Sequence, residues 1–235
     1  MIVLGIDTSG YANAVGVADG ERILADSIFS ARTDSLEKII SNIDSVLKEA
    51  NLCLEDVQGF GVGLGPGSWT GIKVGVTVAK ILAYSAGKPV CGVPTLEVLA
   101  YGARNNPGQI CPIIYAGTKD TVYAAFYRTE NGVVSRVADY YVGDLQGLSK
   151  MVRESTVVVA SEAQSYCRLI GQAISSADID IQAVEGVPGG AMVALLAAAR
   201  LERGESDDVL SLEPLYLKES TARAFPGRTQ AKGRV

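Results

Sequence analysis

The sequence predicts an α/β protein with two successive lobes, and three observations indicate this class. Apolar residues make up 48% of the 235 positions, which is enough to fill a sizeable core. Each half of the chain shows the same order of expected elements: three strands, a helix, a strand and a helix. A turn-rich stretch at 105–108 separates the halves and is typical of a linker. We therefore place one lobe at 1–104, a second at 108–217, and a basic tail, expected to be disordered, at 218–235.

The first lobe opens with an apolar strand at 2–8 and a hairpin whose turn is Asp19-Gly20. A helix then begins at Asp34, which forms a capping-box pattern with Glu37. In the strand that follows, glycine stands at alternate positions, so another backbone or a ligand can approach one face closely. Thr95 is expected to cap the last helix. The remaining expected elements are strands at 12–18, 22–29, 57–64 and 90–93, and helices at 34–50, 70–86 and 95–103.

The second lobe is expected to contain elements of the same types. Its apolar runs are shorter and its helices less regular, although the order of strands and helices is similar. The expected strands cover 110–116, 122–127, 133–142, 156–160 and 181–184, and the expected helices cover 145–153, 162–174 and 191–203.

The composition excludes several classes of function. The net charge is −5, from 21 basic and 26 acidic residues, whereas a body that coats a phosphate backbone is expected to be basic. The absence of histidine removes His-ligated metal sites and His-dependent catalytic triads. The cysteines at 53, 91, 111 and 167 form no Cys-x-x-Cys pair, so we expect neither a thiolate metal site nor a disulfide framework. With no signal peptide and no charge-free run of membrane length, we expect a cytoplasmic protein.

Two loops could bind phosphate. Asp7-Thr8-Ser9 ends the first strand, where an acid can hold a hydrated magnesium ion and hydroxyls can bond phosphate oxygens; otherwise it is a turn that bonds its own backbone. The glycine loop, which includes Gly65, Gly67 and Ser68, lies between a strand and a helix, where backbone amides can bind anions. It matches neither the P-loop nor the dinucleotide-binding spacing, and its glycines could instead permit close packing. The sequence leaves both interpretations open.

Two helices indicate a protein partner. In the helix at 70–86, small residues recur at intervals of four from Gly71 to Ala83 and form a groove that another helix can approach. The rest of its surface is apolar apart from two lysines, so we expect it to be covered nearly all round, by the helix at 34–50 or by another subunit. The residues expected to contact a partner are Leu36, Ile39, Ile40, Ile43 and Leu47 of the first helix, with Gly71, Val74, Gly75, Val78, Ile81 and Leu82 of the second.

These motifs together resemble the TsaB (YeaZ) family. The resemblance is carried by Asp7-Thr8-Ser9, by the capped first helix and, most specifically, by Gly65-Pro66-Gly67-Ser68-Trp69-Thr70-Gly71 running on into the next helix. It covers most of 1–104 and is weaker afterwards, where Leu215-Tyr216-Leu217 is similar to the family's terminal Pro-x-Tyr-x-Arg element, with Lys218 in place of Arg.

This resemblance implies an actin-like ATPase fold (ASKHA, ribonuclease H-like) with two lobes of βββαβα type. It implies a non-catalytic subunit of the machinery that installs threonylcarbamoyladenosine beside the anticodon of tRNA. The family's catalytic subunit is a paralogue, TsaD, which binds the first two helices of the N-terminal lobe, and an ATPase, TsaE, joins that pair. A homodimer through the same helices is implied when TsaD is absent, and tRNA is contacted only indirectly.

The chain departs from the family pattern at two places. Thr33-Asp34-Ser35 stands where many members have His before Ser, and Tyr115-Ala116-Gly117 stands where the family has Asp-Ala-Arg. Any role carried over to these positions is therefore in doubt, and the expectation that the chain lacks catalysis is reinforced.

The leading hypothesis is a scaffold that activates TsaD, with no catalytic residue, no metal ligand and no cofactor of its own. A vestigial phosphate site would then remain, with weak binding of ATP, ADP or magnesium left open; its residues are Asp7, Thr8, Ser9, Gly65, Gly67 and Ser68. The alternative is an active ATPase or phosphotransferase, in which Asp7 holds magnesium and Lys73 is the nearest cation. A glycoprotease is disfavoured, because there is no histidine to bind zinc. The basic tail either solubilises the chain or gives tRNA a salt-sensitive, sequence-blind contact.

Overall fold

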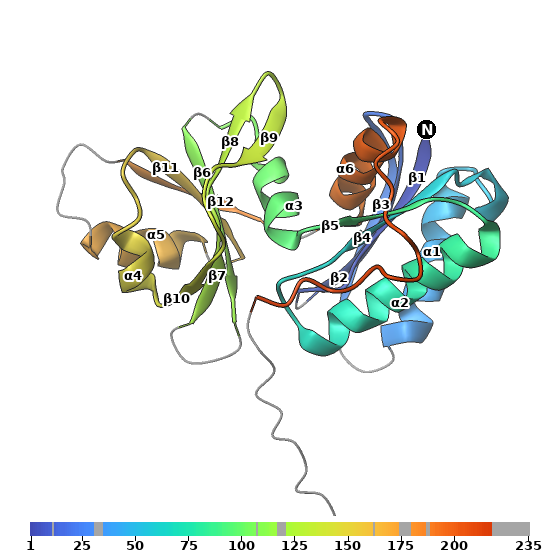
Figure 1. Cartoon of the computed structure of the whole chain (residues 1–235), viewed down its shortest axis with the longest axis horizontal. Coiled ribbons are helices and arrows are strands. Elements are labelled where there is room, and N and C mark those ends of the chain that lie inside the picture. Colours follow the sequence, from blue (N-terminus) through green and yellow to red (C-terminus); the bar gives the residue numbers. More distant parts are fainter. Residues whose placement is uncertain are drawn as a thin grey trace, which may run out of the picture.

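The computed structural model describes residues 1–10, 12–30, 35–106, 108–116, 121–161, 163–173, 180–186 and 189–217, with the backbone alone at 35–37. Its strands form two sheets that stand side by side, each between layers of helices (Figure 1). No helix within these ranges is long and apolar enough to cross a membrane. The tail at 218–235 and the predicted cap residue Asp34 lie outside the described residues.

The first sheet has five strands in the order β3-β2-β1-β4-β5. They are β1 (Ile2–Asp7), β2 (Ala12–Asp19), β3 (Arg22–Ser30), β4 (Gly59–Gly63) and β5 (Val90–Val93). The β2–β3 turn lies one residue later than predicted, because Asp19 still pairs with Arg22. β1 pairs antiparallel with β2 and parallel with β4. The carboxyl ends of β1 and β4 are therefore neighbours, which brings the two candidate phosphate loops together.

The second sheet has seven strands, with the path β10-β7-β6-β11-β12 and with β8 between β6 and β9. They are β6 (Gln109–Tyr115), β7 (Val122–Ala124), β8 (Tyr127–Glu130), β9 (Val133–Arg136), β10 (Tyr141–Gly143), β11 (Thr156–Ala160) and β12 (Ile181–Glu185). The single strands predicted at 122–127 and 133–142 are each divided in two. The reason is a change of partner, since β7 pairs with the end of β6 and with β10, whereas β8 pairs with the start of β6 and with β9.

The helices form three layers around the sheets. They are α1 (Ser35–Glu49), the 3-10 turn η1 (Leu54–Asp56), α2 (Trp69–Ala86), α3 (Thr95–Gly102), α4 (Leu145–Ser149), α5 (Ala163–Ala173) and α6 (Gly190–Glu202). Figure 1 shows α1 and α2 covering one face of the first sheet, and α4 and α5 covering the outer face of the second. α6 and α3 lie between the sheets, α6 against the first and α3 against the second.

The packing of α3 and α6 corrects the predicted lobes. α6 follows the strands of the second sheet in the sequence but packs on β1, β2 and β4 of the first. Glycine permits this approach, because a Cβ on Gly5 would lie only 2.2 Å from Gly190 O. α3 precedes the linker but packs against β6, β9 and β11. The strands of the first sheet thus lie within 1–104 and those of the second within 108–217, whereas α3 and α6 each pack on the sheet of the other range.

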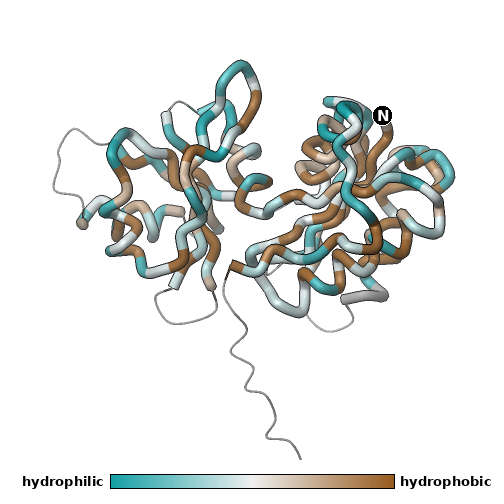
Figure 2. Tube along the Cα trace, viewed as in Figure 1, coloured by the Kyte–Doolittle hydropathy of each residue, from teal (hydrophilic) through white to brown (hydrophobic). Residues whose placement is uncertain are grey.

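Apolar side chains fill the spaces between the layers. Figure 2 shows the hydrophobic segments running along the strands of both sheets. Between the first sheet and its outer helices, the fully buried side chains include Ile6, Phe60, Ile39 and Ile72. Burial of apolar surface, which contributes roughly 25 cal/mol per Å², holds α1 and α2 against the sheet. The outer surfaces of these two helices are what remains for other contacts.

Candidate functional site

The two candidate loops meet at the carboxyl end of the first sheet. Asp7 ends β1, and Gly65 to Ser68 connect β4 to α2. All six residues of the predicted phosphate site are brought together here, so the grouping made from the sequence holds in space. Whether this group can accept a ligand depends on which of its hydrogen-bonding atoms are already used.

Asp7 is buried, with 1% of its surface exposed. Its Oδ1 accepts hydrogen bonds from the backbone N of Ser9 at 2.8 Å and from Ser9 Oγ at 2.6 Å. Among the described residues, its Oδ2 has no hydrogen-bond partner, and a Cβ on Gly63 would lie 2.2 Å from it. Burial raises the pKa of Asp7, while the two bonds from Ser9 partly oppose the rise. This arrangement makes the anion that would bind magnesium more costly to form than it is for an exposed carboxyl.

The turn after β1 packs directly against the glycine loop. Thr8 Oγ1 donates to Gly71 O at 2.7 Å, and the backbone N of Ser68 donates to Ser9 O at 2.7 Å. A Cβ on Gly67 would lie 2.2 Å from Ser9 O, so only glycine fits at this contact. The Oγ of Ser68 accepts from Gly71 N at 3.2 Å and caps α2.

Thr95 completes this network instead of capping α3. Its Oγ1 accepts from the backbone N of Gly65 at 3.1 Å and donates to Ser9 Oγ at 3.1 Å, while Pro94 occupies the cap position of α3. A continuous chain of hydrogen bonds thus runs from Gly65 through Thr95 and Ser9 to Asp7. The hydroxyl protons of Ser9 and Thr95 and the backbone N of Gly65 and Ser68 are therefore engaged within the protein in this conformation.

The small-residue groove of α2 faces its own chain. A Cβ on Gly71 would lie 2.0 Å from Thr8 O, and a Cβ on Gly75 would lie 2.2 Å from Thr8 Oγ1. Further along the helix, Ala79 and Ala83 are buried in the core of the first half. The groove is thus filled by the β1–β2 turn and the sheet, and Gly71 and Gly75, predicted to contact a partner, face Thr8 of their own chain. The spacing predicted a close approach correctly but could not say which element makes it.

The apolar residues predicted to contact a partner divide into three groups. Some are buried between the helices and the first sheet and cannot contact a partner in this conformation: Ile39, Ile43, Leu47 and Val78. Val74 and Leu82 are half-buried. Ile40 on α1 and Ile81 on α2 are exposed, and the side chain of Leu36 lies outside the described part of the chain. The predicted partner surface is therefore much smaller than the sequence suggested.

The structure adds aromatic residues that the sequence analysis did not select. Tyr84, next to Ile81 on α2, is 69% exposed, and Ile81 itself is 59% exposed. At the start of the same helix, the Trp69 ring lies 4.2 Å from the Tyr216 ring between centroids, and Lys73 Nζ lies 4.3 Å from the Trp69 centroid. Trp69, Lys73 and Ile81 recur at multiples of four, so helical periodicity could have separated this outward row from the inward one.

One of the two departures from the family pattern is partly described. Tyr115 ends β6 and is exposed, whereas Gly117 in the same motif lies outside the described residues. The other departure, at Thr33 and Asp34, also lies outside them.

Comparisons with known proteins agree on one group of relatives. The family model described as "TsaD: tRNA N6-adenosine threonylcarbamoyltransferase" matches residues 29–175. The tRNA threonylcarbamoyladenosine biosynthesis protein TsaB of Bacillus subtilis is 27% identical over 227 residues, covering 95% of this chain and 97% of that protein. Its Escherichia coli counterpart is 30% identical over 135 residues, covering 57% of this chain and 58% of that protein.

Solved structures agree on the fold. YeaZ from Pseudomonas aeruginosa superposes with a TM-score of 0.76 at 22% identity, covering 92% of this chain and 99% of that one. A ROK hexokinase from Thermus thermophilus gives a TM-score of 0.56 at 14% identity, covering 87% and 100%. At these identities the likeness concerns the fold alone, and it confirms the predicted actin-like ATPase fold.

Proposed function

The chain belongs to the TsaB (YeaZ) family, and from this premise we propose that it is a non-catalytic subunit in the synthesis of threonylcarbamoyladenosine in tRNA. In this role it binds and activates a TsaD partner, and TsaE joins through that pair. Contact with tRNA is made by the assembly rather than by this chain's acidic body. When TsaD is absent, two copies associate through the same surface.

The observation that carries the proposal is the exposed apolar side of the outer helices. Ile40 on α1, and Ile81 and Tyr84 on α2, present large apolar side chains to solvent on two neighbouring helices. Ile81 and Tyr84 stand three residues apart on α2, so they share one side of that helix, and adjoining apolar exposure of this kind is typical of a protein interface. Two helices of this length offer enough surface for an interface of standard size, about 800 Å² per partner.

The closed loops at the end of β1 support a non-catalytic role. An active phosphotransferase needs positioned cations and free donors for the transferred phosphate. Here the Ser9 hydroxyl donates to Asp7 and the Thr95 hydroxyl donates to Ser9, while Lys73 lies over the Trp69 ring. These contacts favour a scaffold over the alternative ATPase.

The test compares two matched charge substitutions. Ile81→Arg places a charge on the outer side of α2, and Val133→Arg places one at an equally exposed apolar position on β9. We expect Ile81→Arg to weaken binding to TsaD of the same organism at least tenfold, about 1.4 kcal/mol, and to reduce self-association in light scattering. Val133→Arg should change neither.

Two results would contradict the proposal. One is an unchanged TsaD affinity, by calorimetry, for a correctly folded Ile81→Arg/Tyr84→Asp double variant. The other is micromolar binding of magnesium-ATP by the wild-type chain that disappears in Asp7→Ala, which would favour the alternative ATPase.

A further inference from the structure

The segment after α6 crosses the part of the molecule built on the first sheet, called the first half here, and reaches the part built on the second sheet, called the second half. Residues 205–217, named the strap here, leave the end of α6, pass the edge strand β5, and run beside α2 toward the second sheet (orange-red in Figure 1). Apart from a single bridge to β5, the strap forms no regular strand or helix. Its course is fixed by contacts at three places, and these decide what it can do.

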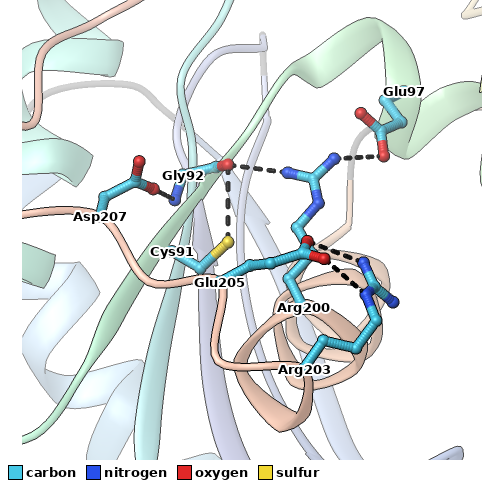
Figure 3. Close-up of polar contacts among 7 residues, drawn as sticks. All are labelled: Cys91, Gly92, Glu97, Arg200, Arg203, Glu205 and Asp207. Carbon is cyan, nitrogen blue, oxygen red and sulfur yellow. Dashed lines mark hydrogen bonds and ion pairs between the residues drawn. The ribbon is translucent and has the colours of Figure 1, made fainter.

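The first contact lies at the edge of the sheet. Asp207 donates its backbone N to Val90 O at 2.9 Å, and its Oδ2 accepts from Gly92 N at 2.7 Å. Figure 3 shows Asp207 beside Gly92, whose carbonyl on the other side accepts from Arg200 of α6. The beginning of the strap is therefore bonded to β5 on both sides of Cys91.

The second contact joins the strap to α2. Lys80 Nζ donates to Leu210 O at 2.9 Å and to Leu212 O at 3.0 Å, and the Leu212 side chain is buried in the core of the first half. Further on, the backbone N of Leu215 donates to Leu64 O at 2.8 Å. The middle of the strap thus moves with α2 and with the glycine loop.

The third contact lies where the strap reaches the second half. Tyr216 stacks on Trp69 at the exposed start of α2, and the next residue, Leu217, packs with the cluster that includes Tyr123 of β7. Pro66, Trp69, Tyr123 and Leu215 to Leu217 line a cavity of about 30 Å³ at this junction. Adjacent strap residues therefore touch the outward row of α2 on one side and the second sheet on the other.

We propose that the strap is a clamp that couples the outward surface of α2 to the second half of the molecule. The inference rests on the proposed function, since a partner that covers α2 would meet Trp69 and Tyr216 at its edge. Fixing Tyr216 fixes Leu217, and Leu217 restrains β7. The ion pair between Arg200 and Glu97 also joins the halves, but it lies in the middle layer and is out of reach of a partner on α2.

Amide hydrogen exchange on the free chain tests whether the strap holds both α2 and β7 in place. In Tyr216→Ala/Leu217→Ser we expect amide exchange at least tenfold faster both at the start of α2 and in β7, because both lose their packing against the strap. Leu210→Ser is the matched control, since that side chain is 74% exposed and its backbone carbonyl still accepts from Lys80. Acceleration confined to the strap itself, or equal to that of the control, would overturn the clamp.

Amide hydrogen exchange in the presence of TsaD tests whether a partner bound on α2 affects β7 through the strap. In the wild-type chain, TsaD should slow exchange in α2 and also in β7, whereas in the double variant only α2 should be slowed. Equal slowing of β7 in both proteins would overturn the clamp and leave the proposed function standing. If TsaD slows no segment of the wild-type chain, the proposed function fails, and the exchange of the free chain still decides whether the strap joins the halves.

Discussion

Asp7 illustrates how a residue suited to catalysis can serve the structure instead. An acid at the end of a central strand is well placed to hold a metal ion, yet both hydrogen bonds on its Oδ1 come from Ser9 two residues away. Its Oδ2 faces the backbone of Gly63, whose missing side chain makes room for the carboxyl group. The burial that excludes water also makes ionisation of this group unfavourable.

The raised pKa of Asp7 predicts a pH-dependent stability. Burial raises the pKa of this carboxyl in the folded chain above its ordinary value of 3.8, so the folded state holds the proton more tightly than the unfolded state. The stability that this proton contributes is complete below the ordinary value and is lost as the pH rises through the raised, folded-state pKa.

Asp7→Asn should therefore stabilise the protein at neutral pH. The amide keeps an acceptor for Ser9 and carries no charge, but its NH2 group takes the place of Oδ2, which has no partner among the described residues. Because only the cost of ionisation is removed, we expect the free energy of unfolding at pH 7 to rise by on the order of 1 kcal/mol. The gain should shrink toward pH 3. Urea denaturation across this range measures it, with the exposed Asp139→Asn as control. A gain independent of pH would show that Asp7 is not the titrating group.

At the scale of elements, α2 shows what sequence patterns can and cannot predict. The helix, its bounds within one residue and its close-packed stripe all follow from local spacing. The partner of that stripe does not, because Thr8 lies more than sixty residues away in the sequence and meets Gly71 only once β1 and β4 pair. A glycine stripe has the same pattern whether it faces a turn of its own chain or another subunit.

The same limit explains the two misplaced helices. α3 and α6 were assigned to lobes by their order along the chain, and nothing local in their sequences shows which sheet they cover. Glycines on strands of the first sheet, among them Gly5 on β1 and Gly16 on β2, leave room for the α6 backbone. Strand β11, whose residues are all buried, was predicted with the bounds that it has, because an uninterrupted β-branched run is a local signal.

Gly75→Ala tests the inward orientation of the α2 stripe. The added Cβ would lie 2.2 Å from Thr8 Oγ1, and either the helix or the turn must move to relieve this contact. Despite the higher helix propensity of alanine, we expect the free energy of unfolding to fall by about 1–3 kcal/mol, as for other overpacked cores.

Gly102→Ala provides the comparison for this variant, because no atom lies within 4 Å of a Cβ at that helical position. Thermal or urea unfolding of the isolated chain is sufficient for the measurement. A Gly75→Ala variant that is as stable as wild type, but loses TsaD binding, would mean that the stripe does face a partner.

For the whole molecule, the middle layer decides how the two halves are held. Arg200 on α6, which packs on the first sheet, pairs with Glu97 on α3, which packs on the second, at 2.6 Å. The guanidinium also donates to Gly92 O of β5 at 3.0 Å. These groups tie three elements together at one point between the sheets (Figure 3). Because both side chains are less than one quarter exposed, the pair is screened less than a surface ion pair.

A double-mutant cycle on this pair is therefore informative about the joint between the halves. Arg200→Met leaves the Glu97 carboxylate largely buried without its cation, and we expect the free energy of unfolding to fall by about 2–3 kcal/mol, somewhat below the cost of breaking a fully buried pair. Adding Glu97→Leu removes the stranded charge and should recover a substantial part of that loss. If the losses of the single variants simply add in the double variant, the two groups are uncoupled. The halves would then be held by apolar packing and the strap rather than by this ion pair.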